Sequence, residues 1–156
     1  LTDEVLRQLA AQGVPFRPGA QELLADLRRS GVKTALVTMS MRRMALSVVD
    51  LIDFPAFDVV VAGDDVTRPK PYPDPYLQAA DALGVAIGDT VAIEDSPNGL
   101  RSALASGAVT LGVPLMVSLD EVGAHALWPT LAGRGAADLA ALHSTHAPAT
   151  TPQETR

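Results

Sequence analysis

The stretch Val91–Gly107, VAIEDSPNGLRSALASG, places two adjacent acids directly after a short apolar run. Val91–Ile93 has the composition of a buried strand, so Glu94 and Asp95 would lie at its carboxyl end. Apolar residues at helical spacing predict a helix that starts at about Pro97, because proline fits the first helical turn. Ligands of open α/β sheets bind at the carboxyl ends of strands, and paired carboxylates suit Mg²⁺. A solvated acidic turn is the alternative for such a pair taken alone.

Strands and helices alternate along the rest of the chain. Short apolar runs predict strands at Thr34–Thr38, Asp58–Ala62, Thr90–Ile93 and Val109–Val113. Periodic apolar residues predict helices at Leu1–Gln12, Ala20–Ser30, Met41–Leu51, Pro75–Leu83 and Ala136–Leu142. Further short strands are predicted at Leu115–Val117 and Leu127–Leu131. This alternation predicts an α/β fold with a parallel sheet built from βαβ units.

The composition limits the classes of partner. The chain has 156 residues and a net charge of −6, so we expect neither nucleic acid nor an anionic membrane surface as a partner. Its apolar runs are much shorter than a bilayer crossing requires. With no cysteine, the chain has neither disulfides nor thiolate chemistry. We expect a cytoplasmic protein, in which an anionic substrate would need a local cation.

Polar residues occur near the ends of three predicted strands, and successive sets are separated in the sequence by about the length of one βαβ unit. Thr38 ends the first strand, and the helix that follows would offer free N–H groups to an anion. Lys70 stands between two prolines, which restrict the backbone on both sides. Glu94 and Asp95 complete the set. The alternatives are a helix N-cap for Thr38 and a solvated side chain for Lys70.

Three segments carry a resemblance to a known family. VTMS at 37–40, RPKPYPDPY at 68–76 and IEDSPNG at 93–99 resemble motifs II, III and IV of the haloacid dehalogenase-like (HAD) phosphohydrolase superfamily. The branch that contains β-phosphoglucomutase and phosphoglycolate phosphatase is the most similar. The resemblance implies a Rossmann-like parallel sheet with helices on both faces, and Mg²⁺ as cofactor.

The resemblance also implies roles for individual residues. Thr38 and Lys70 would be catalytic, with Thr38 binding the transferring phosphoryl group and Lys70 neutralising its charge. Met39, which opens the helix after Thr38, would add a phosphate contact. Apart from the resemblance, the position of Arg42 after the Thr38 loop would also allow it to reach a substrate phosphate, and a solvated helix cation is the alternative. The metal ligands would be Glu94 and Asp95, with Asp95 as the direct ligand, and Asp74 would support the loop that carries Lys70. Positioning and charge compensation of this kind supply most of the catalysis of phosphoryl transfer.

One departure from the family pattern concerns its nucleophile. The family carries a DxD motif at the tip of an N-terminal strand, followed by a helical cap, and this chain has neither. We therefore expect residues 1–16 to be the remnant of a cap, residues 17–143 to form the HAD-like core, and residues 144–156 to be a disordered tail. Covalent phosphoryl transfer needs the nucleophile, so the chain alone should not turn over phosphate esters by the family mechanism.

The absent strand would belong between Thr34–Thr38 and Thr90–Ile93, which would leave both neighbours without a ladder partner. An N-terminal segment of the natural protein, which is the outcome we favour, or a second chain could fill the gap; alternatively, the two flanking strands could pair directly. The predicted function is a Mg²⁺-dependent phosphatase that acts on a small phosphorylated metabolite. A sugar phosphomutase is one alternative. A non-catalytic remnant that binds phosphate or Mg²⁺, or serves in assembly, is the other.

Overall fold

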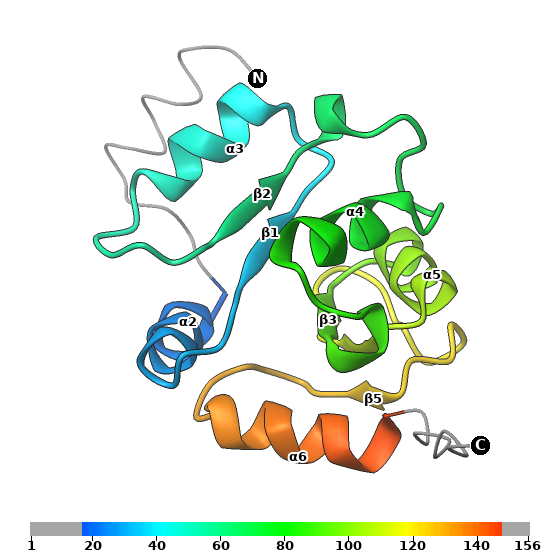
Figure 1. Cartoon of the computed structure of the whole chain (residues 1–156). Helices are drawn as coiled ribbons and strands as arrows, with labels where there is room; N and C mark the ends of the chain where they lie inside the picture. The colour runs from blue at the N-terminus through cyan, green and yellow to red at the C-terminus, as the bar shows by residue number, and fades with distance from the viewer. Residues whose placement is uncertain (1–16, 148–156) are drawn as a thin grey trace, which may run out of the picture.

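A computed structural model describes residues 17–147. Within this part of the chain, five short strands form two separate sheets, β1–β2 and β3–β4–β5 (Figure 1). The strands span Ala35–Val37 (β1), Val59–Val61 (β2), Val91–Glu94 (β3), Val109–Gly112 (β4) and Ala126–Leu127 (β5). All strand pairs are parallel. The predicted α/β class and parallel strands are confirmed.

The two sheets face each other through β1 and β3, which are not hydrogen-bonded to each other. β1 pairs only with β2, in a register that matches Ala35 with Val59. β3 pairs only with β4, in a register that matches Val91 with Val109. Of the three outcomes considered for a missing strand, direct pairing of the flanking strands is therefore not the one that residues 17–147 adopt.

Helices cover both faces of the two sheets. They span Ala20–Arg29 (α2), Arg42–Val49 (α3), Asp74–Leu83 (α4), Pro97–Ser106 (α5) and Ala136–His146 (α6), with single 3₁₀ turns at Gly63–Asp65 (η1) and Ile87–Asp89 (η2). α2 and α6 lie on the face toward which Val91 and Ile93 point, whereas Ala92, the residue between them, packs on the side of α5. None of the helices between residues 17 and 147 has the length and apolar character that a bilayer crossing requires.

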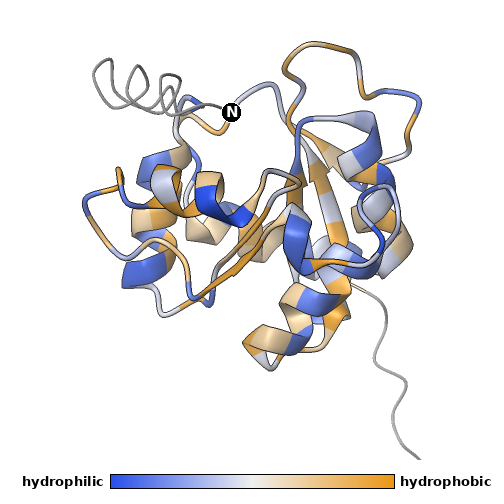
Figure 2. Cartoon of the chain, turned by 90° about the horizontal axis from the view of Figure 1, so that it is seen from above, coloured by the Kyte–Doolittle hydropathy of each residue, from blue (hydrophilic) through white to orange (hydrophobic). Residues whose placement is uncertain are grey.

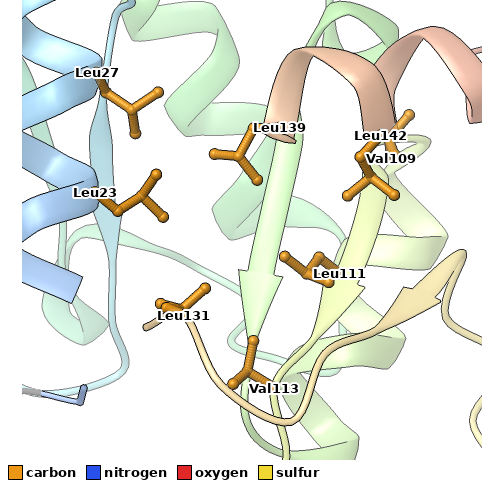
Figure 3. Packing of buried hydrophobic residues seen from close by; sticks show 8 residues of the cluster. All are labelled: Leu23, Leu27, Val109, Leu111, Val113, Leu131, Leu139 and Leu142. Carbon is orange, nitrogen blue, oxygen red and sulfur yellow. The ribbon is translucent and has the colours of Figure 1, made fainter. Parts of the chain in front are cut away.

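The largest cluster of buried side chains joins the two halves of the molecule. Leu23 and Leu27 project from α2 toward Leu139 of α6, and Leu111 lies among them on β4 (Figure 3). The strands are coloured mainly as hydrophobic and lie between helices that also carry hydrophilic residues (Figure 2). Burying apolar area contributes about 25 cal/mol per Å², so this cluster stabilises the packing of α2 against α6 and the β3–β4–β5 sheet.

Two helices, α5 and α3, start for different reasons, one local and one long-range. At α5, the Ser96 hydroxyl accepts a hydrogen bond from the Gly99 amide at 3.1 Å, and Pro97 occupies the first helical position. At α3, the carboxylate of Asp64 accepts the Arg42 amide at 2.7 Å. The cap of α5 is readable from the sequence, but the cap of α3 comes from a distant turn.

Some predicted elements differ from the structure. Leu115–Val117 is an exposed bend rather than a strand. The strand predicted at Leu127–Leu131 is the shorter β5, which pairs with the far edge of β4. α6 continues to His146, so the predicted tail is wrong for residues 144–146. The cap remnant at residues 1–16 and the rest of the tail lie outside the described residues.

Acid should weaken the contact that ties α2 to the first sheet. Asp58 accepts hydrogen bonds from Arg28 Nη1 at 2.5 Å and from the Thr34 amide at 2.8 Å. The Arg28 guanidinium, followed by the Thr34 amide, holds the pKa of Asp58 below its ordinary value of 3.8. A carboxylate with a lowered folded-state pKa stabilises the fold above its unfolded pKa, and this contribution is lost as the pH falls through the folded value.

We therefore expect the free energy of unfolding to fall below a pH of about 4, and to fall less steeply in Asp58→Asn. Urea titrations between pH 2.5 and 7 would measure the slope. Asp81→Asn, which changes an exposed carboxylate on α4, is the matched control. Equal slopes in the wild type and Asp58→Asn would contradict the prediction.

Candidate active site at the carboxyl ends of β1 and β3

The centre of the candidate site is the ammonium group of Lys70. Its Nζ donates to the backbone oxygen of Val37 at 3.0 Å and lies 2.5 Å from Glu94 Oε1. Val37 ends β1 and Glu94 ends β3, so a single side chain bridges the carboxyl ends of both strands. The bridge therefore brings the carboxyl ends of β1 and β3 close together. The alternative of a solvated Lys70 is excluded, because only 12% of its side chain is exposed.

Glu94 is buried, and one of its carboxylate oxygens is engaged by two side chains. Its side chain is 8% exposed, and Oε1 accepts the hydroxyl of Tyr76 as well as the ammonium of Lys70. Lys70 Nζ also lies 5.3 Å from the centre of the Tyr76 ring. Burial, followed by the negative charge of Glu94, raises the pKa of the Tyr76 hydroxyl, which therefore stays protonated and donates to Glu94.

Asp95 contrasts with Glu94. It is exposed, and within residues 17–147 its carboxylate has neither a hydrogen bond nor an ion pair. Hard oxygen ligands suit Mg²⁺, which keeps several waters and takes only one or two carboxylates. No group of three or more acidic or histidine side chains is arranged for a metal in the described part of the chain. The residues present therefore fit a Mg²⁺ ion held by Asp95 and water, with Glu94 beside it.

Thr38 follows β1 directly, next to the residue that accepts Lys70. Its amide donates to Val61 O at 2.9 Å, and its hydroxyl accepts the Ser40 amide at 3.2 Å. The N-cap of α3 is Met41, so the alternative of a helix cap does not hold for Thr38. Because the hydroxyl acts as an acceptor toward Ser40, its proton remains available for an anion.

The loop that carries Lys70 is fixed from both sides. Arg68 Nε donates to Asp74 Oδ2 at 3.0 Å, and a second guanidinium nitrogen lies 3.0 Å from Oδ1. The Ser102 hydroxyl donates to the Tyr72 carbonyl at 2.5 Å, which ties the loop to α5. The peptide bond between Lys70 and Pro71 is cis. Asp74 therefore supports the Lys70 loop, as predicted.

One of the predicted phosphate-binding residues, Arg42, directs its side chain to another part of the chain, and the carbonyl of a second, Met39, packs against a glycine. The Arg42 guanidinium donates to Asp65 Oδ1 at 3.2 Å and to Val60 O at 3.1 Å. These contacts direct it to the end of β2, so a phosphate would have to compete with them. The carbonyl of Met39 lies so close to Gly63 that an added Cβ would overlap it. The structure thus groups Lys70 with Glu94 but directs Arg42 elsewhere.

Sequence reasoning missed two residues of the site. Tyr76 lies in the quoted RPKPYPDPY segment, but its position gives no sign that it would donate to Glu94. Gly99 is buried in the first turn of α5, where a Cβ would overlap the Glu94 carboxylate. The IEDSPNG segment contains this glycine, and only the three-dimensional contact explains why a side chain does not fit there.

Replacing Gly99 by alanine should therefore destabilise the fold, although alanine favours helices by up to about 1 kcal/mol over glycine. The methyl group would displace Glu94 from Lys70 and Tyr76, and overpacking of this kind costs about 1–3 kcal/mol. Urea unfolding followed by Trp128 fluorescence would measure the change. Asn98→Ala, at an exposed neighbour on the same turn, is the control. A gain in stability for Gly99→Ala would contradict the close approach.

Comparisons with known proteins identify the family of the chain. A family model described as a haloacid dehalogenase-like hydrolase matches residues 2–107. The chain belongs to this HAD-like hydrolase family. Hexitol phosphatase A of Escherichia coli K12 is 36% identical over 110 residues, which cover 70% of this chain and 51% of that protein. Phosphoglycolate phosphatase of the same strain is 31% identical over 114 residues, covering 72% of this chain and 45% of that protein.

Solved structures of HAD-like proteins have the same fold. CbbY from Rhodobacter sphaeroides, crystallised in complex with phosphate, superposes with a TM-score of 0.76 at 35% identity, and the match covers 85% of this chain and 63% of that one. β-Phosphoglucomutase from Clostridium difficile gives a TM-score of 0.78 at 19% identity, covering 91% and 61%. The chain spans about half the length of the curated relatives it matches.

Proposed function

We propose that this chain supplies the phosphate-binding and metal-binding residues of a Mg²⁺-dependent phosphohydrolase that acts on a small phosphorylated metabolite in the cytoplasm. One observation carries the proposal: Lys70 bridges the carboxyl ends of β1 and β3, beside Thr38 and Asp95. An ammonium group has three donors, and Val37 and Glu94 take two of them. The third is left for a phosphoryl oxygen. The similarity to two named phosphatases supports the same reaction class.

In the proposed mechanism, the protein positions the phosphoryl group and compensates its charge. The Thr38 hydroxyl and the amide of Met39 donate to phosphoryl oxygens, and Lys70 donates from the loop between η1 and α4. Glu94 fixes the direction of the ammonium group, and Tyr76 fixes Glu94. Asp95 would hold Mg²⁺ with Glu94 beside it, and the ion, when bound, would neutralise charge on the phosphoryl oxygens.

The acids upstream of Thr38 in the described chain lie in α2 and do not reach this site. Asp26 accepts the Ala136 amide at 2.7 Å and so anchors the start of α6, and Glu22 lies in the first turn of α2. This observation favours the non-catalytic alternative for the chain on its own, which would then bind phosphate and Mg²⁺ without turnover. The full reaction would need a nucleophile from elsewhere.

Two measurements test the proposed function. A ligand at ten times its Kd adds about 1.4 kcal/mol to the free energy of unfolding, so Mg²⁺ with inorganic phosphate should raise the unfolding temperature. Asp95→Asn should abolish the increase that depends on Mg²⁺, whereas Asp81→Asn, an exposed acid on α4, should retain it. No increase in the wild type would overturn the proposal.

The second measurement is turnover of p-nitrophenyl phosphate by the purified chain with Mg²⁺. Turnover that Asp95→Asn abolishes would establish catalysis by the chain alone. Binding without turnover would support the non-catalytic alternative for the isolated chain.

A further inference from the structure

The 3₁₀ turn η1, which follows β2, contacts the segment between β1 and α3 at three points. The Gly63 amide donates to Ser40 O at 2.8 Å. The Arg42 amide donates to Asp64 Oδ1 at 2.7 Å, and Arg42 Nε donates to Asp65 Oδ1 at 3.2 Å. η1 is therefore bonded to the segment that carries the phosphate donors, yet it has no part in the proposed mechanism.

The loop after β1 is held between β2 and η1. At its start, the Thr38 amide donates to Val61 O at 2.9 Å, and the Ser40 amide then donates to the Thr38 hydroxyl at 3.2 Å. In its middle, the Met39 carbonyl approaches Gly63 so closely that no side chain fits at that position. The direction of the Met39 amide, one of the proposed phosphate donors, therefore depends on where η1 lies.

Asp65 also connects η1 to α4, the helix that begins directly after the Lys70 loop. Gln78 Nε2 on α4 donates to the backbone oxygen of Asp65 at 3.2 Å, and Asp65 Oδ2 accepts the Ala62 amide at 2.8 Å. The Ala62 amide, followed by the Arg42 guanidinium, holds the pKa of Asp65 below its ordinary value of 3.8. η1 is thus bonded to the loop after β1 on one side and to α4 on the other.

Charge alone would make η1 an unfavourable neighbour for an anion. Asp64 and Asp65 are both carboxylates, and a carboxylate repels phosphate. Their hydrogen bonds offer a compensating effect. A loop that is fixed before binding loses less conformational entropy when the ligand arrives, and so binds more tightly. Charge and positioning therefore predict opposite results when one of these acids is removed.

We propose that Asp64 and Asp65 are positioning residues of the phosphate site. Asp64 fixes the start of α3 through the Arg42 amide. Asp65 holds the Arg42 guanidinium at the end of β2, so that Arg42 acts through Asp65 and not on the ligand. Together the two acids keep the Thr38 hydroxyl and the Met39 amide in place for the phosphoryl group. This inference rests on the proposed function, because it requires the loop to bind phosphate.

The first test titrates the full 156-residue chain with inorganic phosphate at a fixed Mg²⁺ concentration, followed by the NMR shift of the Met39 amide. Asp64→Ala should weaken phosphate binding about fivefold, the factor that corresponds to one helix-cap hydrogen bond. Asp64→Asn removes the charge but retains an acceptor for the Arg42 amide, so it should bind at least as tightly as the wild type. Asp53→Ala, at an exposed acid beyond the C-terminal end of α3, should bind as the wild type does.

The second test applies the same titration to the ion pair of Arg42 with Asp65. Asp65→Asn frees the guanidinium but keeps an acceptor for the Ala62 amide, and it should weaken phosphate binding about two- to fivefold, the range of a partly exposed ion pair. Arg42→Gln should have an effect of the same size. The double variant should be no weaker than either single variant, because both changes remove one interaction.

Hydrogen exchange without ligand separates this inference from the proposed function. In Asp64→Ala the amides of Ser40 and Arg42 should exchange faster than in the wild type, while the Val109 amide on β4 should stay unchanged. If the wild type binds no phosphate, the proposed function fails, and the role of η1 at the phosphate fails with it. The exchange rates then decide whether Asp64 holds the loop.

Other results would overturn the positioning role and leave the proposed function intact. Phosphate binding that Asp64→Ala leaves unchanged would show that this acid only stabilises the fold. Tighter binding in Asp64→Ala would show that its charge outweighs its hydrogen bond. Tighter binding in Asp65→Asn would show that the freed Arg42 guanidinium contacts phosphate directly.

Discussion

Replacing Lys70 by methionine should lower the free energy of unfolding by about 3–5 kcal/mol, because it leaves the carboxylate of Glu94 buried without its cation. The exposed fractions of the two side chains are 12% and 8%, so water cannot take over the role of the ammonium. Methionine retains much of the apolar stem and avoids a large cavity. Urea unfolding at neutral pH, followed by Trp128 fluorescence, would measure the loss.

The control is a second cation in the same loop. Arg68 pairs with Asp74, but its side chain is 58% exposed, and exposed ion pairs contribute about 0–1 kcal/mol. Arg68→Met should therefore cost far less than Lys70→Met. A double variant, Lys70→Met with Glu94→Gln, should recover much of the loss, since it removes the unpaired charge as well. Equal costs for the two single variants would show that the Lys70–Glu94 pair is solvated in solution.

The Lys70 pair also shows how far sequence patterns reach. Parallel strands and βαβ spacing predicted that Lys70 and Glu94 would meet at one edge, and the structure joins them. The pattern could not predict Tyr76 as the second donor to Glu94, because a hydroxyl six positions after Lys70 has no periodic signature. For Arg42 the sequence pattern predicted a contact that the structure does not favour. Its position allowed a phosphate contact, and a distant turn at Asp65 determines where the guanidinium points.

The predicted elements were reliable where local signals agreed. α5 has a serine cap, a proline at its first position and a glycine at its C-terminal end. The predicted start at Pro97 is confirmed. Leu115–Val117 had only apolar composition in its favour, and without a neighbouring strand edge these residues form an exposed bend. The gap in the sheet was predictable because this chain lacks one strand that the family carries. The arrangement of the chain around that gap depends on how α2, α4 and α6 pack.

Truncating Leu111 to alanine should cost about 2–5 kcal/mol, in the upper part of that range. Leu111 is 0% exposed, and its strand is hydrogen-bonded on both sides, so the backbone cannot move to fill the new cavity. Leu36 on β1 is the matched comparison, because it has the same side chain on a strand that borders the gap. Its half-buried side chain has less apolar area to lose.

Leu36→Ala should therefore cost clearly less than Leu111→Ala when both are measured by urea unfolding of the isolated chain. Equal costs would mean that the space beside β1 is already filled in solution. In that case the half-buried state of β1 and β3 would not describe the isolated chain.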